Sequence, residues 1–325
     1  MKKFLKENIV FLLSMVFILV IFNIRLPYYI SAPGGVIDIS DRISYDEKEE
    51  YEGSLNMLYV TEYVATIPTY LMSYINKDWD REEIVKSKVS SDESVKDIDA
   101  RNKIMLDNSL DNAKYVAYKA SGMDVKVNKI VHQIVGKVID NDFLVGDQVL
   151  KVNGEDIESF DDIKEIINNS KISDELVVNI IRDGKERVIK EKIREVDGSK
   201  ALGIILMTDY DYEVSPEVEI NFRKSESGSS GGLMMALTIY SAISGEDILK
   251  GRDIAGTGTI DINGNVGAIA GVKYKIMGAY KNDMDVVLVP RDNYEEAISV
   301  KNEKGYDMEI VSVDTFMDAI NYLRG

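Results

Sequence analysis

The sequence contains one loop of small residues that leads directly into an apolar segment. Residues 225–232 consist of serine, glycine and one glutamate, and residues 233–237 are all apolar. This pattern predicts a loop followed by a buried helix, whose first N–H groups lack partners within the helix and stabilise negative charge. A serine at that point has its hydroxyl beside a preformed oxyanion site. We therefore expect the chain to be organised around this loop, with Ser230 as the candidate nucleophile.

The composition excludes several classes of site. The 325 residues are 45% hydrophobic and 29% charged, which is typical of two globular domains or of one domain with an insertion. The net charge of −17 argues against nucleic-acid binding. The chain has no cysteine, which excludes thiol catalysis and disulfides, and only one histidine, His132. Metal sites usually draw on several histidines, so we expect neither a metal nor a cofactor.

The N-terminus has the pattern of a membrane anchor. Three lysines among residues 2–6 precede residues 9–24, which are almost entirely apolar. The stretch is slightly short for a span, and flanking basic side chains can extend it. The lysines predict that the N-terminus is cytoplasmic and that everything after Arg25 is outside the cell. A cleaved signal peptide is the alternative, but residues 31–33 form a poor cleavage site, so we favour an uncleaved anchor over residues 1–29.

Residues 124–198 have a different pattern, with short strands and turns. Residues 146–154 contain an alternating strand closed by an Asn-Gly turn, and a helix and a hairpin follow. The run Gly-Asp-x-(apolar)-x-x-Val-Asn-Gly in residues 146–154 resembles the fingerprint of a PDZ domain.

The PDZ resemblance implies that a peptide binds as an added strand. The expected groove lies against the helix predicted over residues 161–169 and is lined by one strand, with Val131, His132, Ile134 and Val135. A strand-rich linker domain without a ligand is the alternative.

A nucleophilic serine needs a general base. Lys273, at the start of a second predicted helix, can serve only with a neutral amine, so burial must lower its pKa from about 10.4 toward about 7–8. Thr257 offers a hydroxyl that could orient this amine. The loop residues Gly228, Ser229 and Gly231 would bind the substrate and its oxyanion, and Ser229 is the rival nucleophile.

Two other interpretations of the serine loop are weaker. Its Gly-x-Ser-x-Gly run also fits the nucleophile elbow of α/β-hydrolases, but that fold needs a histidine after the serine and His132 precedes it. A phosphate-binding loop is disfavoured because no basic residue follows closely.

These motifs together resemble the proteolytic domain of Lon. Residues 228–232 correspond to the Gly-Pro-Ser-Ala-Gly of that family, residues 257–260 to Thr-Gly-Glu-Ile, and residues 264–275 to Gly-x-Val-x-x-Ile-Gly-Gly-(Leu/Val)-Lys-x-Lys. The interval from Ser230 to Lys273 is 43 positions, the spacing of the family. The resemblance implies that Ser230 is the nucleophile, Lys273 the general base and Thr257 the residue that orients the lysine.

The resemblance also implies the architecture, an α+β fold. We expect a Lon-type proteolytic domain with an inserted PDZ-like β-rich domain, preceded by one transmembrane helix. The expected segments are the cytoplasmic tip and anchor (1–29), the N-terminal part of the protease domain (30–123), the PDZ domain (124–198) and the catalytic domain (199–325). The sequence contains no Gly-x-x-x-x-Gly-Lys-Ser/Thr motif, so the ATPase of Lon is absent from it.

This combination is similar to the membrane-anchored PDZ–Lon proteases of Gram-positive bacteria. The similarity implies an ATP-independent serine endopeptidase at the cell surface, which hydrolyses extracellular peptides or unfolded protein segments recognised through the PDZ domain. The alternative is a catalytically inactive cell-surface scaffold that binds peptides. The sequence does not indicate the oligomeric state.

Overall fold

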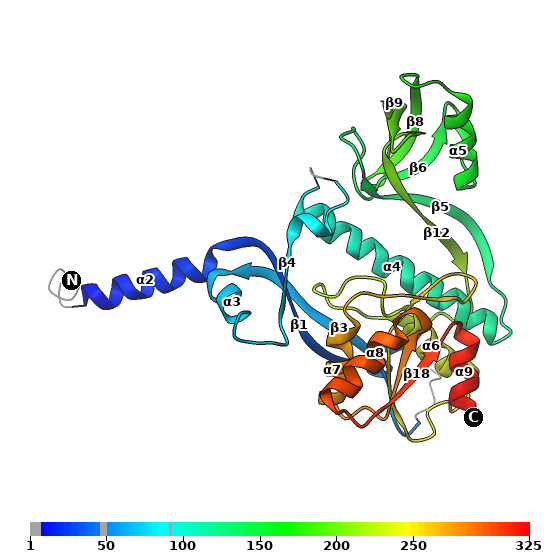
Figure 1. The fold of residues 1–325 in the computed structure, drawn as a ribbon. Coiled ribbons are helices and arrows are strands. Elements are labelled where there is room, and N and C mark those ends of the chain that lie inside the picture. Colours follow the sequence, from blue (N-terminus) through cyan, green and yellow to red (C-terminus); the bar gives the residue numbers. More distant parts are fainter. Residues whose placement is uncertain (1–7, 46–50, 91–92) are drawn as a thin grey trace.

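The computed structural model describes residues 8–45, 51–90 and 93–325. Figure 1 shows a larger body, a smaller β-rich body and a projecting N-terminal helix, α2 (Ile9–Asn23). The lysines expected to face the cytoplasm lie outside the described residues. Within the described ranges, no helix combines the length and the apolar character needed to cross a membrane.

A mixed six-stranded sheet forms the centre of the larger body, in the order β18-β17-β14-β3-β1-β4. The first four strands of this order are parallel, and β1 and β4 are each antiparallel to their neighbour. Strands from both sides of the PDZ-like segment therefore share one sheet. The strands are β1 (Arg25–Asp38), β3 (Ser54–Thr66), β4 (Asp80–Glu83), β14 (Asp253–Gly256), β17 (Val286–Pro290) and β18 (Glu309–Val313).

Helices cover both faces of this sheet. Because side chains alternate along a strand, Met57 and Ile254 face one layer while Leu58 and Ala255 face the other. The first layer contains α4 (Val95–Ala120), α6 (Gly232–Ser244) and α9 (Phe316–Arg324), and the second contains α7 (Val272–Lys281) and α8 (Arg291–Lys304).

Two helices of the first layer position the serine loop. The apolar segment after the loop forms α6, which is buried along nearly its whole length, as predicted. Helix α4 begins after Ser94, which forms a reciprocal capping box with Asp97 that satisfies the first N–H groups.

The smaller body contains a second sheet in the order β12-β5-β6-β8-β9, with α5 (Phe160–Asn169) and the short β7 (Glu155–Asp156) beside it. The predicted hairpin is formed by β8 and β9. Strand β12 follows the boundary predicted at residue 198, but it pairs with β5 over its whole length. These strands are β5 (Lys126–Lys137), β6 (Gln148–Val152), β8 (Glu175–Arg182), β9 (Lys185–Lys192) and β12 (Ile204–Glu213).

Short elements complete the fold. Helix α3 (Ile67–Met72) follows β3 and lies against the C-terminal end of α2. Strand β1 begins at Arg25, and Tyr29 is buried against Ile84 and Ile98, so the sheet starts before the anchor boundary predicted at residue 29. The remaining strands form three two-stranded pairs: β2 (Ile43–Ser44) with β13 (Glu219–Ile220), β10 (Arg194–Val196) with β11 (Ser199–Ala201), and β15 (Thr259–Ile260) with β16 (Val266–Gly267).

Candidate active site

Ser230 lies two positions before the first residue of α6. Its carbonyl oxygen accepts two hydrogen bonds from the segment that follows β14, one from the Thr257 hydroxyl at 2.9 Å and one from the Gly258 N–H at 2.8 Å. The serine backbone is therefore fixed to the carboxyl end of a central strand, where α/β sheets commonly place their sites.

The loop before Ser230 is also held from outside. The Glu226 carboxylate accepts two bonds from Arg42, at 2.8 and 2.7 Å, and the Glu226 carbonyl accepts one from Lys103 at 3.0 Å. Ser109 of α4 donates to the Ser229 carbonyl at 3.0 Å. Arg42, Lys103 and Ser109 lie more than a hundred positions away in the chain and have no motif of their own, so the sequence alone does not predict their contacts with the loop.

Close packing explains why the two residues after Ser230 are glycines. A Cβ atom on Gly231 would lie 2.0 Å from the Met57 sulfur, and one on Gly232 would lie 2.7 Å from the Ser109 hydroxyl oxygen. Within the described part of the chain, the N–H groups of Ser230 and Gly231 have no hydrogen-bond acceptor. Free N–H groups at a helix N-terminus are suited to bind an oxyanion.

The amine beside Ser230 belongs to Lys275. Its Nζ atom lies 2.7 Å from the Ser230 hydroxyl oxygen and 2.7 Å from the Thr257 hydroxyl oxygen. The Lys275 side chain is buried, with 2% of the residue exposed, and Thr257 is fully buried. Burial lowers the pKa of Lys275 to about 7, because an ammonium group loses its hydration there. This amine is therefore neutral in a large fraction of molecules at neutral pH.

The predicted position of Lys273 beside Ser230 is wrong. Lys273 forms an ion pair with Asp80 at 2.9 Å, and the Tyr274 hydroxyl binds the same carboxylate. Helix α7 begins at Val272, and its buried face repeats at three- and four-residue steps through Lys275, Ile276 and Ala279. Lys273 lies about 100° round the helix from Val272, away from this face. The motif contains two lysines, and the spacing of 43 positions predicts the first of them, Lys273. Helical periodicity instead favours Lys275, which lies on the buried face.

The structure also shows where the other predicted residues of the serine loop lie. The structure brings together Ser230 and Thr257, and the amine contacts the hydroxyl of Ser230, so Ser229 is not its partner. Gly228 has a φ of 91° and donates its N–H to the Asn102 carbonyl at 2.8 Å, which turns the chain toward α6.

The groove predicted on the PDZ-like body is also misplaced. Strand β5 pairs with β12 on one edge, and at His132 with β6 on the other, so no peptide can be added beside Val131–Val135. His132 is only 2% exposed, its Nδ1 lies 3.2 Å from the Thr208 hydroxyl, and its ring packs on Phe160. Ile134 and Val135 are buried as well. The two edge strands of this sheet are β12 and β9.

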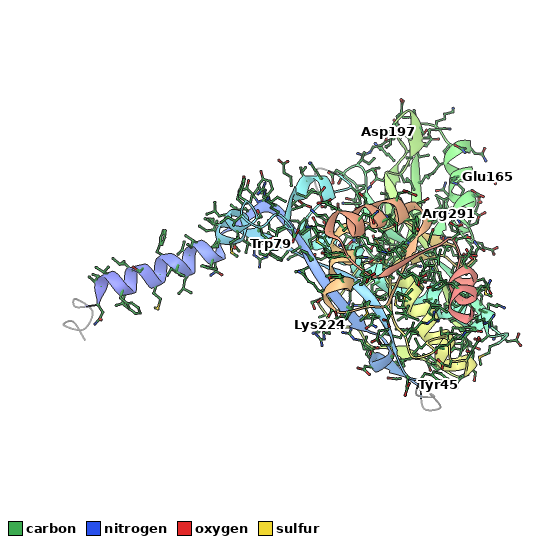
Figure 2. All side chains as sticks on the ribbon, turned by 60° about the horizontal axis from the view of Figure 1, so that its bottom comes forward. Tyr45, Trp79, Glu165, Asp197, Lys224 and Arg291 are labelled. Carbon is green, nitrogen blue, oxygen red and sulfur yellow. The ribbon has the colours of Figure 1, made fainter. Side chains whose placement is uncertain are left out.

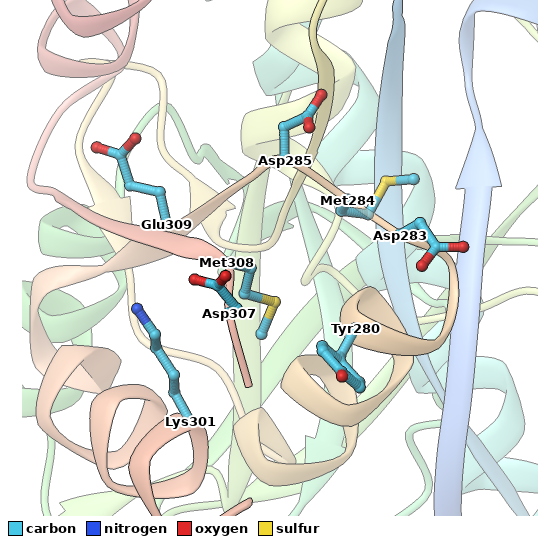
Figure 3. A pocket seen from close by; sticks show the side chains of 8 residues that line it. All are labelled: Tyr280, Asp283, Met284, Asp285, Lys301, Asp307, Met308 and Glu309. Carbon is cyan, nitrogen blue, oxygen red and sulfur yellow. The ribbon is translucent and has the colours of Figure 1, made fainter. Parts of the chain in front are cut away.

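Two cavities lie away from the serine. The first, of about 570 Å³ (Figure 3), opens at the amino ends of β17 and β18. Thr257, in contrast, follows the carboxyl end of β14. Half of the residues in its wall are acidic: Tyr280, Asp283, Met284, Asp285, Lys301, Asp307, Met308 and Glu309. The second, of about 430 Å³, lies where α4 meets β5, β6 and β12. Neither cavity is lined by Ser230, Lys275 or Thr257.

Two family comparisons match the two bodies. Residues 223–323 match the Lon protease (S16) C-terminal proteolytic domain, and residues 103–193 match the PDZ domain. The Lon protease of Campylobacter jejuni is 39% identical over 98 residues, which cover 30% of this chain and 12% of the relative. The Lon protease of Mesomycoplasma hyopneumoniae is 33% identical over 98 residues, covering 30% of this chain and 11% of the relative.

Two further similarities cover other parts of the chain. A peroxisomal Lon protease homologue of Caenorhabditis elegans is 30% identical over 140 residues, covering 41% of this chain and 17% of the relative. Among solved structures, the PDZ domain of an SdrC-like protein from Listeria monocytogenes aligns with a TM-score of 0.22 and 19% identity, over 26% of this chain and 92% of that one. The chain spans less than a fifth of the length of these Lon relatives.

The chain therefore combines a Lon-type C-terminal proteolytic domain with a PDZ domain, an arrangement consistent with a PDZ–Lon-type protease. The expected combination of these two domains within a mixed α and β architecture is confirmed.

Proposed function

We propose that this protein is a serine endopeptidase in which Ser230 is the nucleophile and Lys275 the general base. The observation that carries the proposal is the buried Lys275 amine, 2.7 Å from both the Ser230 and the Thr257 hydroxyl oxygens. A neutral amine has two N–H donors and one lone pair. One N–H binds Thr257, and the lone pair accepts the proton of Ser230.

The reaction then follows from this geometry. Ser230 Oγ attacks the peptide carbonyl carbon while its proton moves to Lys275 Nζ. The resulting oxyanion binds at the free N–H groups of Ser230 and Gly231, at the positive end of α6. The Lys275 ammonium gives its proton to the leaving amine, so the C–N bond breaks and an acyl-serine remains. Water then attacks the ester with Lys275 again acting as the base, and the acid product leaves.

The substrate main chain is proposed to bind along β3. The last pair between β14 and β3 joins Gly256 to Met57, whereas β3 continues to Thr66. Among the described residues, the stretch of β3 after Met57 pairs only with β1, so its other edge has no strand partner. An extended peptide can add there as a strand. This edge begins beside the Thr257–Ser230 contact, which would place a carbonyl group near the nucleophile.

Peptide recognition by the PDZ domain is proposed at the edge of β12 next to α5, before Thr208, whose carbonyl accepts a hydrogen bond from Asn108 of α4. Helix α5 contacts β11, which directly precedes β12. Lys200 of β11 donates to the Asn168 and Ser170 carbonyls, both at 2.6 Å, and so ties the end of α5 to the start of this edge. An edge strand beside a helix is the arrangement that β-augmentation requires.

Attachment to a membrane, with the catalytic body outside the cell, is a further part of the proposal. Its support is α2, which has no buried residue and exposes most of its large apolar side chains. The lysines that precede α2 in the sequence favour a cytoplasmic N-terminus. ATP-independence is proposed because the 325 residues contain no nucleotide-binding loop motif.

Incubation of the full chain with a peptide library, without ATP, tests the proposal. Mass spectrometry should find internal cleavages with the natural chain and none with Ser230→Ala. If the natural chain cleaves no peptide but binds some of them, the protein is a peptide-binding scaffold and the proposal is wrong.

A further inference from the structure

Helix α3 ends in a cluster of exposed apolar side chains. We call Leu71, Met72, Tyr74 and Ile75 the α3 tip; their exposed fractions are 59%, 52%, 63% and 84%. These four apolar side chains, within five positions of the chain, are removed from water only if another surface covers them. Exposed apolar patches of this kind mark interaction sites.

The position of the α3 tip indicates what covers it. Helix α3 contacts α2, and the Tyr28 ring, just after α2, lies 5.0 Å from the Tyr70 ring of α3. Figure 1 shows α3 at the end of α2 that joins the larger body, and Figure 2 shows Trp79 in the same region. The exposed apolar surface of α2 therefore continues onto the α3 tip.

Tyr74 of the α3 tip and its neighbours Tyr70 and Arg81 have the chemistry of a membrane interface. The rings of Tyr70 and Tyr74 are 5.5 Å apart, and the Arg81 guanidinium lies 3.7 Å from the centre of the Tyr74 ring. Arg81 also donates to the Ser73 hydroxyl at 3.2 Å. Tyrosine and arginine join an apolar body to a polar end and are favoured at the level of lipid headgroups.

We propose that the α3 tip inserts into the lipid bilayer at the boundary between headgroups and acyl chains, as a second membrane contact beside α2. This inference rests on the membrane attachment proposed above. The 15 residues of α2 span about 22 Å, less than the bilayer core of about 30 Å, so apolar surface next to its end adds to the depth that the protein fills.

The α3 tip is connected to the catalytic helix. The segment after it enters β4, where Asp80 binds Lys273 and Tyr274 of α7. The same helix carries Lys275. An inserted α3 tip therefore fixes the height of the Ser230–Lys275 pair above the membrane, and the preferred substrates are segments exposed close to the bilayer surface.

A single introduced cysteine tests the insertion, because the chain has none of its own. Ile75→Cys carries an environment-sensitive fluorophore, and the full chain is reconstituted into phosphatidylcholine vesicles that contain lipid with a nitroxide on the upper acyl chain. We expect quenching at position 75 to be at least twofold stronger than at Val188→Cys, an equally labelled exposed position on β9. Equal quenching at the two positions would overturn the inference.

A third label separates this inference from membrane attachment itself. Leu13→Cys reports on α2. Quenching at position 13 without quenching at position 75 leaves the attachment intact and rejects insertion of the α3 tip. No quenching at either position rejects both.

A second copy of the chain is the alternative partner that could cover the α3 tip. Self-quenching at position 75 that is relieved by unlabelled protein, without quenching by nitroxide lipid, would assign the tip to contact between copies and reject the inference. Trp79, the only tryptophan, gives an independent readout in the unlabelled chain: brominated lipid should quench its emission.

Discussion

At the scale of single residues, the proposed chemistry depends on the Lys275 amine. Its neighbours are two hydroxyl groups and apolar surface, and no carboxylate contacts it among the described residues. Burial is the cause of the low pKa of this amine. The two hydrogen bonds orient the amine toward Ser230 and Thr257. Lys273, two positions away, has the opposite environment, since it is paired with Asp80 near the surface.

The first prediction concerns the pH dependence of peptide cleavage. Below pH 7 Lys275 is an ammonium group and cannot accept the Ser230 proton, so kcat/KM should rise with a midpoint near its pKa of about 7 and level off above it. Initial rates on a peptide without titratable side chains, measured from about pH 5.5 to 9.5, check this. A midpoint near 10, the value of an ordinary lysine, would contradict it.

The second prediction concerns Thr257. Replacement by valine keeps the shape but removes the acceptor for Lys275 and the donor to the Ser230 carbonyl. We expect Thr257→Val to lower kcat by about 10- to 100-fold with little change in KM, because the amine loses its orientation. Thr257→Ser keeps the hydroxyl and should recover most of the rate. Equal losses in both variants would show that the methyl packing, rather than the hydroxyl, is needed.

The residues of this site differ in how far the sequence predicts them. Ser230 and Thr257 were predicted because each lies in a short motif whose neighbours, glycine and an extended strand, are visible in the sequence. Lys275 was missed because two lysines share one motif, and only the phase of the helix distinguishes them. Ser109 and Arg42 were not predicted, because tertiary packing alone brings them to the loop.

At the scale of elements, α4 joins the two bodies through its contact with β12. Asn108 donates to the Thr208 carbonyl at 2.9 Å, and the Tyr212 hydroxyl donates to the Asp111 carbonyl at 2.7 Å. Burial, followed by the nearby Asp209 carboxylate, raises the pKa of the Asp111 carboxyl to about 7. The contact therefore contains a carboxylate whose charge is disfavoured at neutral pH.

The third prediction follows from that carboxylate. The folded state holds the Asp111 proton up to about pH 7 and the unfolded state only up to about pH 4, so stability falls as pH rises through this window. Asp107 and Asp211 act in the same direction and Lys114 opposes them. Asp111→Asn should raise the unfolding free energy at pH 8 by about 1–2 kcal/mol, after allowance for solvent screening.

Urea unfolding at pH 5 and pH 8, followed by circular dichroism, measures this difference. Asp140→Asn, at an exposed position, is the matched control. If Asp111→Asn keeps the full pH dependence of the natural chain, another group is responsible.

The elements themselves were predicted to different degrees. Helix α6 and the hairpin of β8 and β9 follow from apolar runs and turn residues that are local in the sequence. The pairing of β12 with β5 joins residues about 80 positions apart. A period-2 pattern predicts a strand but does not identify its partner. The sequence therefore does not show that β5 is an inner strand and that β12 lies at the edge beside it.

At the scale of the whole molecule, one sheet contains the strands that precede and follow the PDZ body, while the serine lies at the end of a parallel strand. The fourth prediction is that the full chain cleaves peptides and an unfolded protein at the same rate with and without Mg²⁺-ATP. A stably folded protein of the same sequence should resist cleavage, because the binding edge proposed on β3 can pair only with an extended chain.

Gel analysis of time courses on the folded and the unfolded substrate checks this prediction. Stimulation by ATP, or rapid cleavage of the folded substrate, would contradict it.

The two lysines of α7 provide the most direct test of the account, because they differ by two positions and share one motif. We predict that Lys275→Ala lowers kcat/KM for peptide cleavage by about 10³-fold or more, as Ser230→Ala does, since a general base is lost. Lys273→Ala, which removes only an ion pair near the surface, should stay within about threefold of the natural chain. An inactive Lys273→Ala beside an active Lys275→Ala would show that Lys273 is the base and that the assignment of Lys275 is wrong.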